Sequence, residues 1–392
     1  MSNLRIALVS RRLWPLTGGE ETAITNLAVE FQRQGAKVHL LTAQWYADWP
    51  VDVVLREIPT TRLRKPPQIG WGMLRYMMAL SRWLRVHERQ FDLVYVSRLQ
   101  QEAYSAIGTL ASTRIPVVLR AVGSGPGGDC RWQERARFGS RIRRRCQRAD
   151  AVIATNPDTN CELAEAGYAA RKTFQIENGV AEISPRDPRG RQAARAALEA
   201  INQDLATNDD TPVLVYIGRL ARGKGIFELL RAWRTIVRTW PHARLWFIGD
   251  GPDRAELYDQ TVDFELRYNV AMPGTFDDVE DILLAADACV VPAREGSSSA
   301  ALLEAMASGI PLIASNIPAH QALLQHNQHA LLVPPNEPRA LASAIMQTFD
   351  YMAAATVRGA AGRQLAHERF SLSRAAASHL ELFERLVEEK RD

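Results

Sequence analysis

The sequence predicts an α/β protein of two doubly wound domains, each a parallel sheet covered by helices on both faces. Three observations predict this class. The first forty residues follow the order strand, loop, helix, strand, which is the βαβ unit of a parallel sheet. A second series of the same kind begins after residue 210. The 392 residues accommodate two domains, and 46% hydrophobic with 23% charged residues excludes a disordered chain.

The first domain is predicted from short apolar runs with the length of buried strands. The first run, Leu4–Ser10, leads into a loop that contains Gly18 and Gly19. A helix is predicted over 20–34, because its apolar side chains recur on one face and Gly35 follows it. Further strands are expected at Val38–Thr42, Asp92–Ser97, Pro116–Ala121, Ala151–Asn156 and Thr173–Glu177.

The second domain is predicted to follow a connection rich in Ser, Pro, Arg, Gly, Asn and Asp. We expect a first domain over 1–185, a linker region over 186–210, a second domain over 211–370 and a terminal helix over 371–392. Strands are expected at Val213–Gly218, Arg244–Gly249, Ala288–Pro292, Leu312–Ser315 and Ala330–Val333. Ligands of doubly wound sheets bind at the carboxyl ends of the strands, so two such domains are expected to face a central cleft.

Charge is distributed unevenly along the chain. Residues 1–185 carry 26 Lys and Arg against 17 Asp and Glu, a net charge of +9, whereas residues 186–392 carry 22 and 27, a net charge of −5. The positive half favours an anionic partner, such as a phosphate or a lipid headgroup. Nucleic acid is not expected, because the sequence has only 7% aromatic residues and no zinc-finger, basic-zipper or RNA-recognition pattern.

The four cysteines indicate a reducing compartment. They are scattered, with no C-x-x-C pair and no metal-ligand spacing to histidine. The apolar run Ile6–Val9 is too short for a signal-peptide core, and no uncharged apolar stretch approaches the ~18 residues of a membrane span. We therefore expect a soluble cytoplasmic protein, with peripheral binding to the inner face of the cell membrane left open.

The strongest local motif is the glycine loop Gly218–Gly225, which follows a predicted strand and precedes a predicted helix. Its G-x-x-x-x-G-K spacing resembles a P-loop, but Gly225 stands where that motif needs the Ser or Thr that holds magnesium. The alternative is a diphosphate pocket at a helix N-terminus, with Arg219 and Lys224 reaching in. A surface turn with two solvated cations would be the default if the motif stood alone.

A second motif, residues 294–311, supports the diphosphate interpretation. Glu295 follows a predicted strand, and small residues lead into a helix that carries Glu304. Two carboxylates beside a helix N-terminus can hold hydroxyl groups, and the free N–H groups there can hold a phosphate or a sugar. Taken alone, Glu304 would more readily be interpreted as a surface residue of the helix, and Glu295 as a charge that stabilises the helix dipole at its N-terminus.

Together these motifs resemble the retaining glycosyltransferases of family four, the "glycosyl transferases group 1" type, which have the GT-B fold of two Rossmann-like domains. The matching pieces keep their order over nearly the whole chain. They are Gly18-Gly19-Glu20, Asn178-Gly179-Val180, Gly218-Arg219-Leu220 with Lys224-Gly225, Gly249-Asp250-Gly251-Pro252, Pro273-Gly274 and the segment Glu295 to Pro311. The resemblance implies that the terminal helix crosses back to the first domain.

The resemblance also implies a role for each matching residue. Arg219 and Lys224 would neutralise the donor diphosphate, Glu295 would bind the transferred sugar, and Glu304 would bind the ribose. Further donor contacts would come from Gly18, Gly19, Gly218, Thr275, Phe276, Ser299, Ala300, Ala301 and Leu302. The donor would be a nucleotide-diphosphate sugar, a substrate rather than a cofactor, and no metal is expected.

The sequence departs from the family pattern at two places. Eight residues, rather than seven, stand between Glu295 and Glu304, and Val122 stands where the family usually has a histidine. Two rival interpretations therefore stay open: a non-catalytic nucleotide-sugar-binding protein, and a sugar-nucleotide epimerase or sugar-phosphate synthase of the same fold.

The acceptor is expected to meet the basic first domain. Candidate contacts are Arg12, Arg98, Arg120 and Ser124, which lie near ends of predicted strands. The stretch Trp71–Gln90 is amphipathic at helical period, with arginines on one face, so it either lies on an anionic bilayer or covers the sheet. A glycan or lipid-linked acceptor in cell-envelope or exopolysaccharide synthesis would fit these features.

Overall fold

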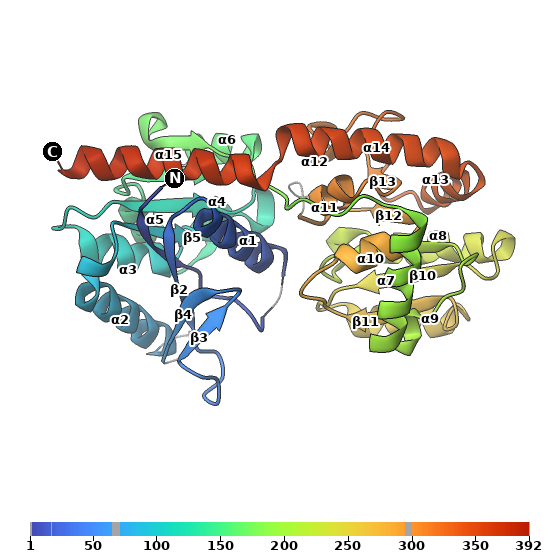
Figure 1. Ribbon diagram of the computed structural model, residues 1–392, viewed down its shortest axis with the longest axis horizontal. Coiled ribbons are helices and arrows are strands. Elements are labelled where there is room, and N and C mark those ends of the chain that lie inside the picture. Colours follow the sequence, from blue (N-terminus) through green and yellow to red (C-terminus); the bar gives the residue numbers. More distant parts are fainter. Residues whose placement is uncertain (1, 17, 65–70, 295–299, 392) are drawn as a thin grey trace. The chain divides into compact units, whose positions relative to one another are not determined.

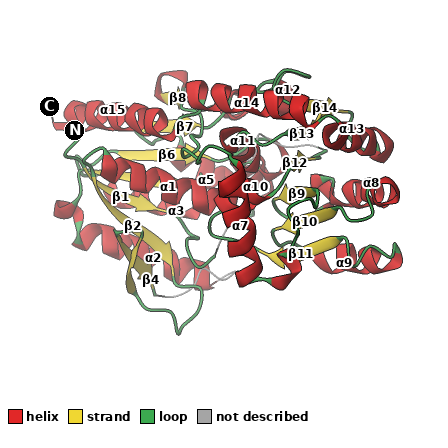
Figure 2. Ribbon diagram, turned by 45° about the vertical axis from the view of Figure 1, so that its right-hand side comes forward, coloured by secondary structure: helices red, strands yellow, loops and turns green. Residues whose placement is uncertain are grey.

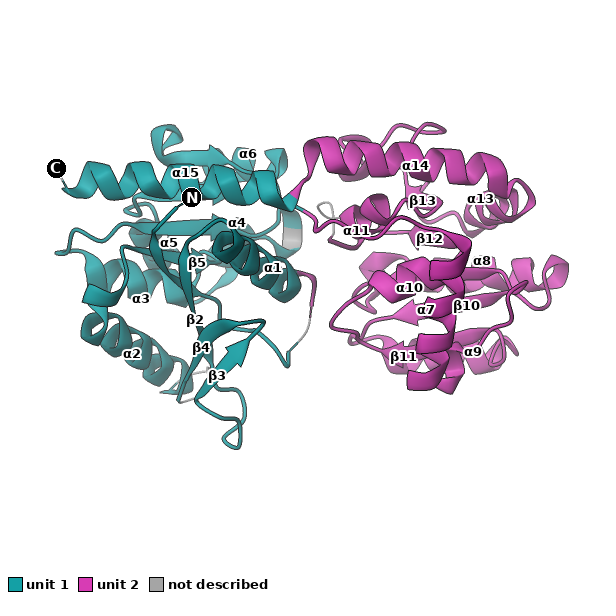
Figure 3. Ribbon diagram, in the orientation of Figure 1, with its two compact units in different colours: residues 1–16, 20–179, 372–392 teal, residues 17–19, 180–371 magenta. Residues whose placement is uncertain are grey.

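A computed structural model describes residues 2–16, 18–64, 71–294 and 300–391. It divides the chain into two compact units (Figure 3). Unit 1 comprises residues 1–16, 20–179 and 372–392, and unit 2 comprises residues 17–19 and 180–371. Among the described residues, no helix combines the length and apolarity needed to cross a membrane.

Unit 1 contains an eight-stranded sheet in the order β3-β4-β2-β1-β5-β6-β7-β8, in which only the β3–β4 pair is antiparallel. Its strands are β1 (Arg5–Val9), β2 (Lys37–Ala43), β3 (Asp52–Leu55), β4 (Ile58–Leu63), β5 (Leu93–Ser97), β6 (Val117–Ala121), β7 (Ala151–Ala154) and β8 (Thr173–Gln175). Its helices are α1 (Gly19–Arg33), α2 (Trp71–Val86), α3 (Gln101–Leu110), α4 (Asp129–Arg135), α5 (Gly139–Cys146), α6 (Pro157–Glu165) and α15 (Leu372–Arg391).

Unit 2 contains a six-stranded parallel sheet in the order β11-β10-β9-β12-β13-β14. Its strands are β9 (Val213–Ile217), β10 (Arg244–Ile248), β11 (Val270–Gly274), β12 (Ala288–Val291), β13 (Leu312–Ser315) and β14 (Leu331–Val333). Its helices are α7 (Pro188–Ile201), α8 (Ile226–Thr239), α9 (Arg254–Asp263), α10 (Glu280–Ala285), α11 (Ala300–Ser308), α12 (Pro318–Gln321), α13 (Pro338–Asp350) and α14 (Met352–Arg369).

Helices cover both faces of each sheet, as the sequence predicts (Figures 1 and 2). In unit 2, alternate residues of β9 point to opposite faces: Val213 and Val215 pack in one apolar cluster with α7, α10 and α11, and Leu214 and Tyr216 pack in another with α8 and α13. Because both faces are buried, the strands are continuously apolar, which is why short apolar runs identified them.

The terminal helix α15 belongs to unit 1, so the expectation that it crosses back is confirmed. Its Phe383 is fully buried against Phe31 of α1 and Tyr95 of β5, at ring-centroid distances of 5.8 and 5.2 Å. His379 Nδ1 donates to the Ala375 carbonyl, so its Nε2 accepts from the Tyr95 hydroxyl at 3.1 Å.

The structure differs from the sequence-based expectation over residues 186–210, which belong to unit 2 rather than to a linker. Asp187 and Pro188 resemble linker residues, but Asp187 caps α7 by accepting from the N–H groups of Arg189 and Gly190. On α7, Arg195 is buried and donates to the Ala285 carbonyl and to Asp287.

Three strands escaped prediction. The β3–β4 hairpin turns at Arg56 and Glu57, which adopt φ of 47° and 68° without the glycine or asparagine that usually marks such a turn. Strand β11 contains Pro273, and proline is tolerated there because β11 is an edge strand.

Candidate active site

Four loops pack together at the carboxyl ends of the strands of unit 2. The loop after β9 is joined to the loop after β10 by the Leu220 N–H, which donates to the Asp250 carbonyl at 2.9 Å. The loop after β10 meets the end of β11 through Gly249 N–H and Gly274 O at 2.7 Å. Arg294 N–H, after β12, donates to the Gly223 carbonyl at 3.1 Å. The glycine loop is therefore built into the ligand edge of the sheet.

Glycine is required at two points of this edge. Gly225 has a φ of 75°, and a Cβ there would lie 1.9 Å from the Pro292 carbonyl oxygen. Gly249 has a φ of 143°, and a Cβ there would lie 1.9 Å from the Gly218 carbonyl oxygen. Only glycine permits these conformations and approaches together. Gly225 is also the N-cap of α8, so the free N–H groups of that helix start at the glycine loop.

The two predicted cations lie on this loop. Arg219 is exposed, and its side chain makes no hydrogen bond or ion pair with another described residue. Lys224 is half-buried and ends the short turn that precedes α8. Arg294 pairs with the buried Glu228. The edge can therefore present Arg219, Lys224 and helix N–H groups to a diphosphate.

His320 lies at the same edge of the sheet, on α12 after β13, and was not among the residues predicted from the sequence. It is buried on α12, and its Nδ1 donates to the Ser315 carbonyl at 2.8 Å. Burial and the positive charge of Lys224 lower the pKa of His320, so the ring is neutral and its Nε2 is a hydrogen-bond acceptor. A lone histidine gives no motif in the sequence; only the fold brings it near Lys224.

Glu304 is half-buried on α11. Burial, with a smaller contribution from the negative charge of Asp278, raises its pKa from 4.5 to about 7. Asp278 lies in the loop after β11, the loop that also carries Thr275 and Phe276. Thr275 is exposed, whereas Phe276 is half-buried and packs against the core. The structure therefore brings Glu304 close to the loop that carries the predicted donor contacts Thr275 and Phe276.

Five predicted site residues lie between the end of β12 and the first turn of α11. Glu295 and Ser299 lie outside the described residues. Ala300 is the first residue of α11, and Ala301 and Leu302 follow it as buried residues. The start of this helix after β12 agrees with the sequence-based expectation.

The predicted acceptor arginines of unit 1 are already engaged. Arg12 Nε lies 3.1 Å from a Glu21 carboxylate oxygen, and Arg98 forms a multidentate pair with Glu20. Arg120 is buried and donates to the Asn178 side chain at 2.7 Å. All three lie at the carboxyl edge of the unit 1 sheet, and their contact with an acceptor stays a prediction.

Gly18 and Gly19 are exposed at the start of α1, and Ser124 is half-buried after β6. Next to Ser124, the N–H of Val122 donates to the buried Asp129 at 2.8 Å. Burial raises the pKa of Asp129 to about 6. The position where the family usually has a histidine thus presents an apolar side chain, and its N–H is already bonded.

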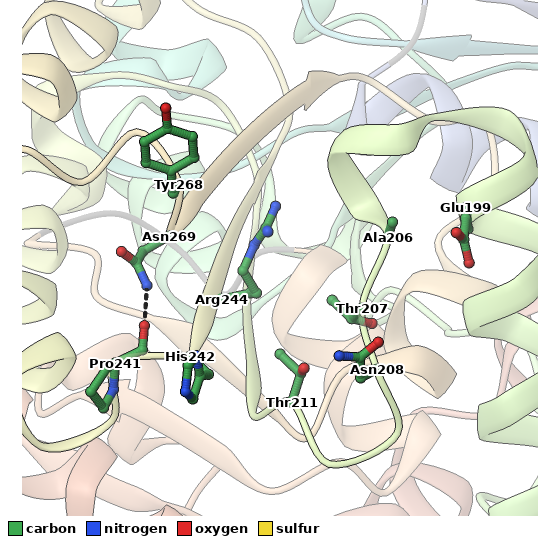
Figure 4. A pocket seen from close by; sticks show the side chains of 10 residues that line it. All are labelled: Glu199, Ala206, Thr207, Asn208, Thr211, Pro241, His242, Arg244, Tyr268 and Asn269. Atoms are coloured by element: carbon green, nitrogen blue, oxygen red, sulfur yellow. Dashed lines mark hydrogen bonds between the residues drawn. The ribbon is translucent and has the colours of Figure 1, made fainter.

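An open, polar cavity of about 390 Å³ lies at the opposite edge of the unit 2 sheet (Figure 4). Its lining comes from segments that lead into β9, β10 and β11 rather than out of them. It is lined by Glu199, Ala206, Thr207, Asn208, Thr211, Pro241, His242, Arg244, Tyr268 and Asn269. Since none of the predicted donor residues lines it, this cavity is not the candidate active site.

The two α/β sheet units, one with a glycine loop, cations and a carboxylate at its ligand edge, have the architecture of the GT-B fold. Family models assign both units. The model described as "Glycosyl transferases group 1" matches residues 211–350, and the model described as "Glycosyl transferase 4-like domain" matches residues 18–179. The chain belongs to this family, the family-four type of glycosyltransferases.

Individual relatives agree with this assignment. The chain is 31% identical over 236 residues to the lipopolysaccharide core biosynthesis glycosyltransferase LpsD of Rhizobium meliloti, a match that covers 60% of this chain and 64% of LpsD, less than two thirds of that relative. The fold of this chain is similar to that of sucrose-phosphate synthase from Thermosynechococcus elongatus. The TM-score is 0.78, the identity is 22%, and the match covers 98% of this chain and 99% of the synthase. The fold is also similar to Anabaena Alr3699/HepE in complex with UDP-glucose, with a TM-score of 0.76, 19% identity and coverage of 98% of this chain and 100% of that structure.

Proposed function

We propose that this glycosyltransferase moves a sugar, with retention of its anomeric configuration, from a nucleotide-diphosphate sugar to a hydroxyl group of a glycan or lipid-linked acceptor. The observation that carries the proposal is that the Gly218–Gly225 loop, which contains Lys224, and the loop after β11, which lies near Glu304, are at one edge of the unit 2 sheet. The solved relative in complex with UDP-glucose supports the choice of donor class.

In the proposed reaction, the bond between the anomeric carbon and the diphosphate oxygen breaks as the acceptor oxygen bonds to the same face of that carbon. The acceptor proton passes to an oxygen of the leaving diphosphate. Arg219, Lys224 and the N–H groups at the start of α8 stabilise the negative charge that develops there. Glu304 accepts hydrogen bonds from the ribose. Glu295 is proposed to bind the transferred sugar.

The protein cations are proposed to replace a catalytic metal. The test is a screen of UDP-, GDP- and ADP-sugars, starting with UDP-glucose, for release of the free nucleoside diphosphate in EDTA. Release that persists in EDTA, with product of retained configuration by NMR, supports the proposal. A strict requirement for magnesium would contradict the role given to Arg219 and Lys224.

The apolar Val122 favours one alternative, a nucleotide-sugar-binding protein without transfer activity. Its side chain cannot hydrogen-bond to a sugar as a histidine would, and its N–H is held by Asp129. The same screen separates the two functions. Binding of a donor without release of nucleoside diphosphate in any glycan mixture supports the alternative, and conversion of the donor sugar without transfer indicates an epimerase.

We further propose that α2 lets the protein bind an anionic membrane. Its predicted apolar face covers the core of unit 1 through Tyr76, Leu80 and Leu84. The opposite face is exposed and combines apolar with basic side chains; it consists of Trp71, Leu74, Arg75, Met78, Arg82 and Arg85. Such a face suits the interfacial zone of a bilayer, and the name of LpsD supports a lipid-linked, cell-envelope acceptor.

A further inference from the structure

Four aromatic residues gather at the carboxyl edge of the unit 1 sheet and play no part in the donor site. Trp14 lies in the loop after β1, and Trp45, Tyr46 and Trp49 lie in the loop after β2. Strands β1, β2 and β4 are parallel neighbours, so their carboxyl ends lie at one edge. We call these four residues the aromatic platform. Ligands of parallel sheets bind at this edge.

Arg62, at the end of β4, ties the two loops of the platform together. It is 3% exposed and donates to the Trp14 carbonyl at 3.0 Å and to the Pro50 carbonyl at 3.3 Å. Its guanidinium lies 5.0 Å from the Trp49 ring centroid and 6.0 Å from that of Trp14. It forms no ion pair with a carboxylate of the described residues, so its partners are the two loops themselves.

Further hydrogen bonds fix the loop after β2. Gln44 Nε2 donates to the Trp49 carbonyl at 2.6 Å, and Trp45 Nε1 donates to the Arg11 carbonyl at 3.1 Å. The Tyr46 and Trp49 rings are 5.0 Å apart. Rings held in this way lose little conformational freedom when a ligand binds, which favours recognition over non-specific adhesion.

The platform combines exposed aromatic rings with a neighbouring charged pair, the groups that proteins use to bind sugars. Trp14 is 46% exposed and Tyr46 is 58% exposed, although large aromatic residues are usually buried in a core. Beside them the Arg12 guanidinium lies 5.9 Å from the Trp45 ring and pairs with Glu21. This pair offers donors and acceptors to hydroxyl groups with little net charge. An aromatic face beside such a pair suits the apolar C–H face and the hydroxyl rim of a sugar ring.

We propose that the aromatic platform binds a neutral sugar ring of the acceptor glycan, with Trp14 and Tyr46 stacking on that ring. This inference rests on the proposed function, because it gives the acceptor a chemical class and a site on unit 1. Residues Arg12 and Glu21 are proposed to bind hydroxyl groups of the same ring. The recognition is thus by stacking and hydrogen bonds rather than by charge.

The test measures binding of neutral hexasaccharides of glucose, mannose, galactose and N-acetylglucosamine to the full-length protein by saturation-transfer NMR and calorimetry. We expect at least one to bind the wild-type protein. The double variant Trp14→Ala/Tyr46→Ala should bind it roughly tenfold more weakly or worse. Tyr268→Ala, which removes an 86% exposed tyrosine of unit 2, is the matched control and should bind like the wild type.

A second variant guards against misfolding. Trp14→Phe/Tyr46→Phe keeps an aromatic ring at both positions, so it should retain most of the affinity, whereas complete loss of affinity there would overturn stacking as the mechanism. Unchanged binding of the hexasaccharides by the double alanine variant, or no binding of any of them by the wild type, overturns the proposal. The proposal is also overturned if the double alanine variant no longer sediments with phosphatidylglycerol vesicles but still binds the hexasaccharides, since the platform would then contact lipid.

Binding of UDP, measured in parallel, separates this inference from the proposed function. The platform variants should bind UDP like the wild type, because all their changes lie in unit 1. If hexasaccharides bind at the platform but no nucleotide sugar is bound or consumed, the proposed function fails and the platform stands. If donor is consumed but the platform variants are indistinguishable from wild type, only the platform fails.

Discussion

Glu304 shows how one residue takes its chemistry from its surroundings. Its carboxyl has a pKa of about 7, because burial and Asp278 both disfavour the charged form. Folding raises this pKa from 4.5, so the folded state holds a proton that the unfolded state releases. The stabilising effect is complete below about pH 4.5 and is lost as the pH rises through about 7. Glu304→Gln should therefore flatten the fall in unfolding free energy over this interval.

The same pKa predicts how donor binding depends on pH. The proposed ribose contact needs the carboxylate, so the affinity for UDP should rise between pH 6 and pH 8, with uptake of ligand coupled to release of a proton. Calorimetry in buffers of different ionisation enthalpy measures that proton. Glu304→Gln should bind UDP more weakly at pH 8 and lose most of the pH dependence; an unaltered pH profile would remove Glu304 from the ribose site.

Lys224 carries the sharpest prediction at the residue scale. Lys224→Ala removes one charge that stabilises the leaving diphosphate, and loss of one such interaction costs about 10²–10³ in rate. Nucleoside-diphosphate release under saturating donor measures the effect. Arg222→Ala is the matched control, because Arg222 lies two residues away but pairs with Glu256 on α9. Equal turnover by Lys224→Ala and the wild type would contradict the assigned role.

At the scale of elements, α2 has one face buried in unit 1 and an opposite, exposed face that is proposed to bind a membrane. Periodicity identified the apolar face, and the structure assigns that face to the core of unit 1. The exposed arginines, together with Trp71, Leu74 and Met78, are then the side chains available to a membrane. Each basic residue contributes about 1 kcal/mol at most near an anionic surface and is screened by salt.

The membrane proposal is tested by sedimentation with phosphatidylglycerol vesicles. The wild-type protein should sediment at low salt and remain in solution at high salt. Reversal to Glu of Arg75 and Arg82 on α2, and of the exposed Arg89 three residues beyond its end, should abolish sedimentation without weakening UDP binding. The control reverses three exposed arginines of unit 2, Arg238, Arg267 and Arg339, and so makes the same change in net charge. If both triple variants behave alike, α2 is not the contact.

For the whole molecule, the return of α15 to unit 1 makes that unit depend on both ends of the chain. Phe383 fills the space between Phe31 and Tyr95. Phe383→Ala should lower the unfolding free energy of unit 1 by about 3–5 kcal/mol, the usual cost of removing a buried phenyl ring. Denaturant unfolding followed by circular dichroism measures it. Glu384→Ala, at the exposed neighbouring position, should change little; equal stability of both variants would show that the Phe383 ring does not stabilise unit 1.

Much of the fold could be predicted because it follows from patterns of neighbouring residues in the sequence. Strands buried on both faces must be apolar along their length, so β1, β2, β5, β6, β9 and β10 were identified from short runs. The glycines of the ligand edge could be identified because Gly225 and Gly249 occupy conformations that only glycine tolerates. Such features depend on neighbours in the sequence, so most strands of the two sheets, and the chemistry expected at the ligand edge of the second, could be predicted.

Other features depend on residues that are distant in the sequence, and only the tertiary structure decided them. Nothing near Arg98 indicates its pairing with Glu20, and nothing near His320 indicates Lys224. The platform exists because Arg62 reaches two loops that begin about fifty and about twenty residues earlier, an arrangement with no motif. The pKa of Glu304 follows from burial, which a sequence does not state. The class of protein and the motifs expected to bind the donor could be predicted from the sequence. Which charges are paired and which aromatic rings are exposed could not, because these follow from contacts made across the folded chain.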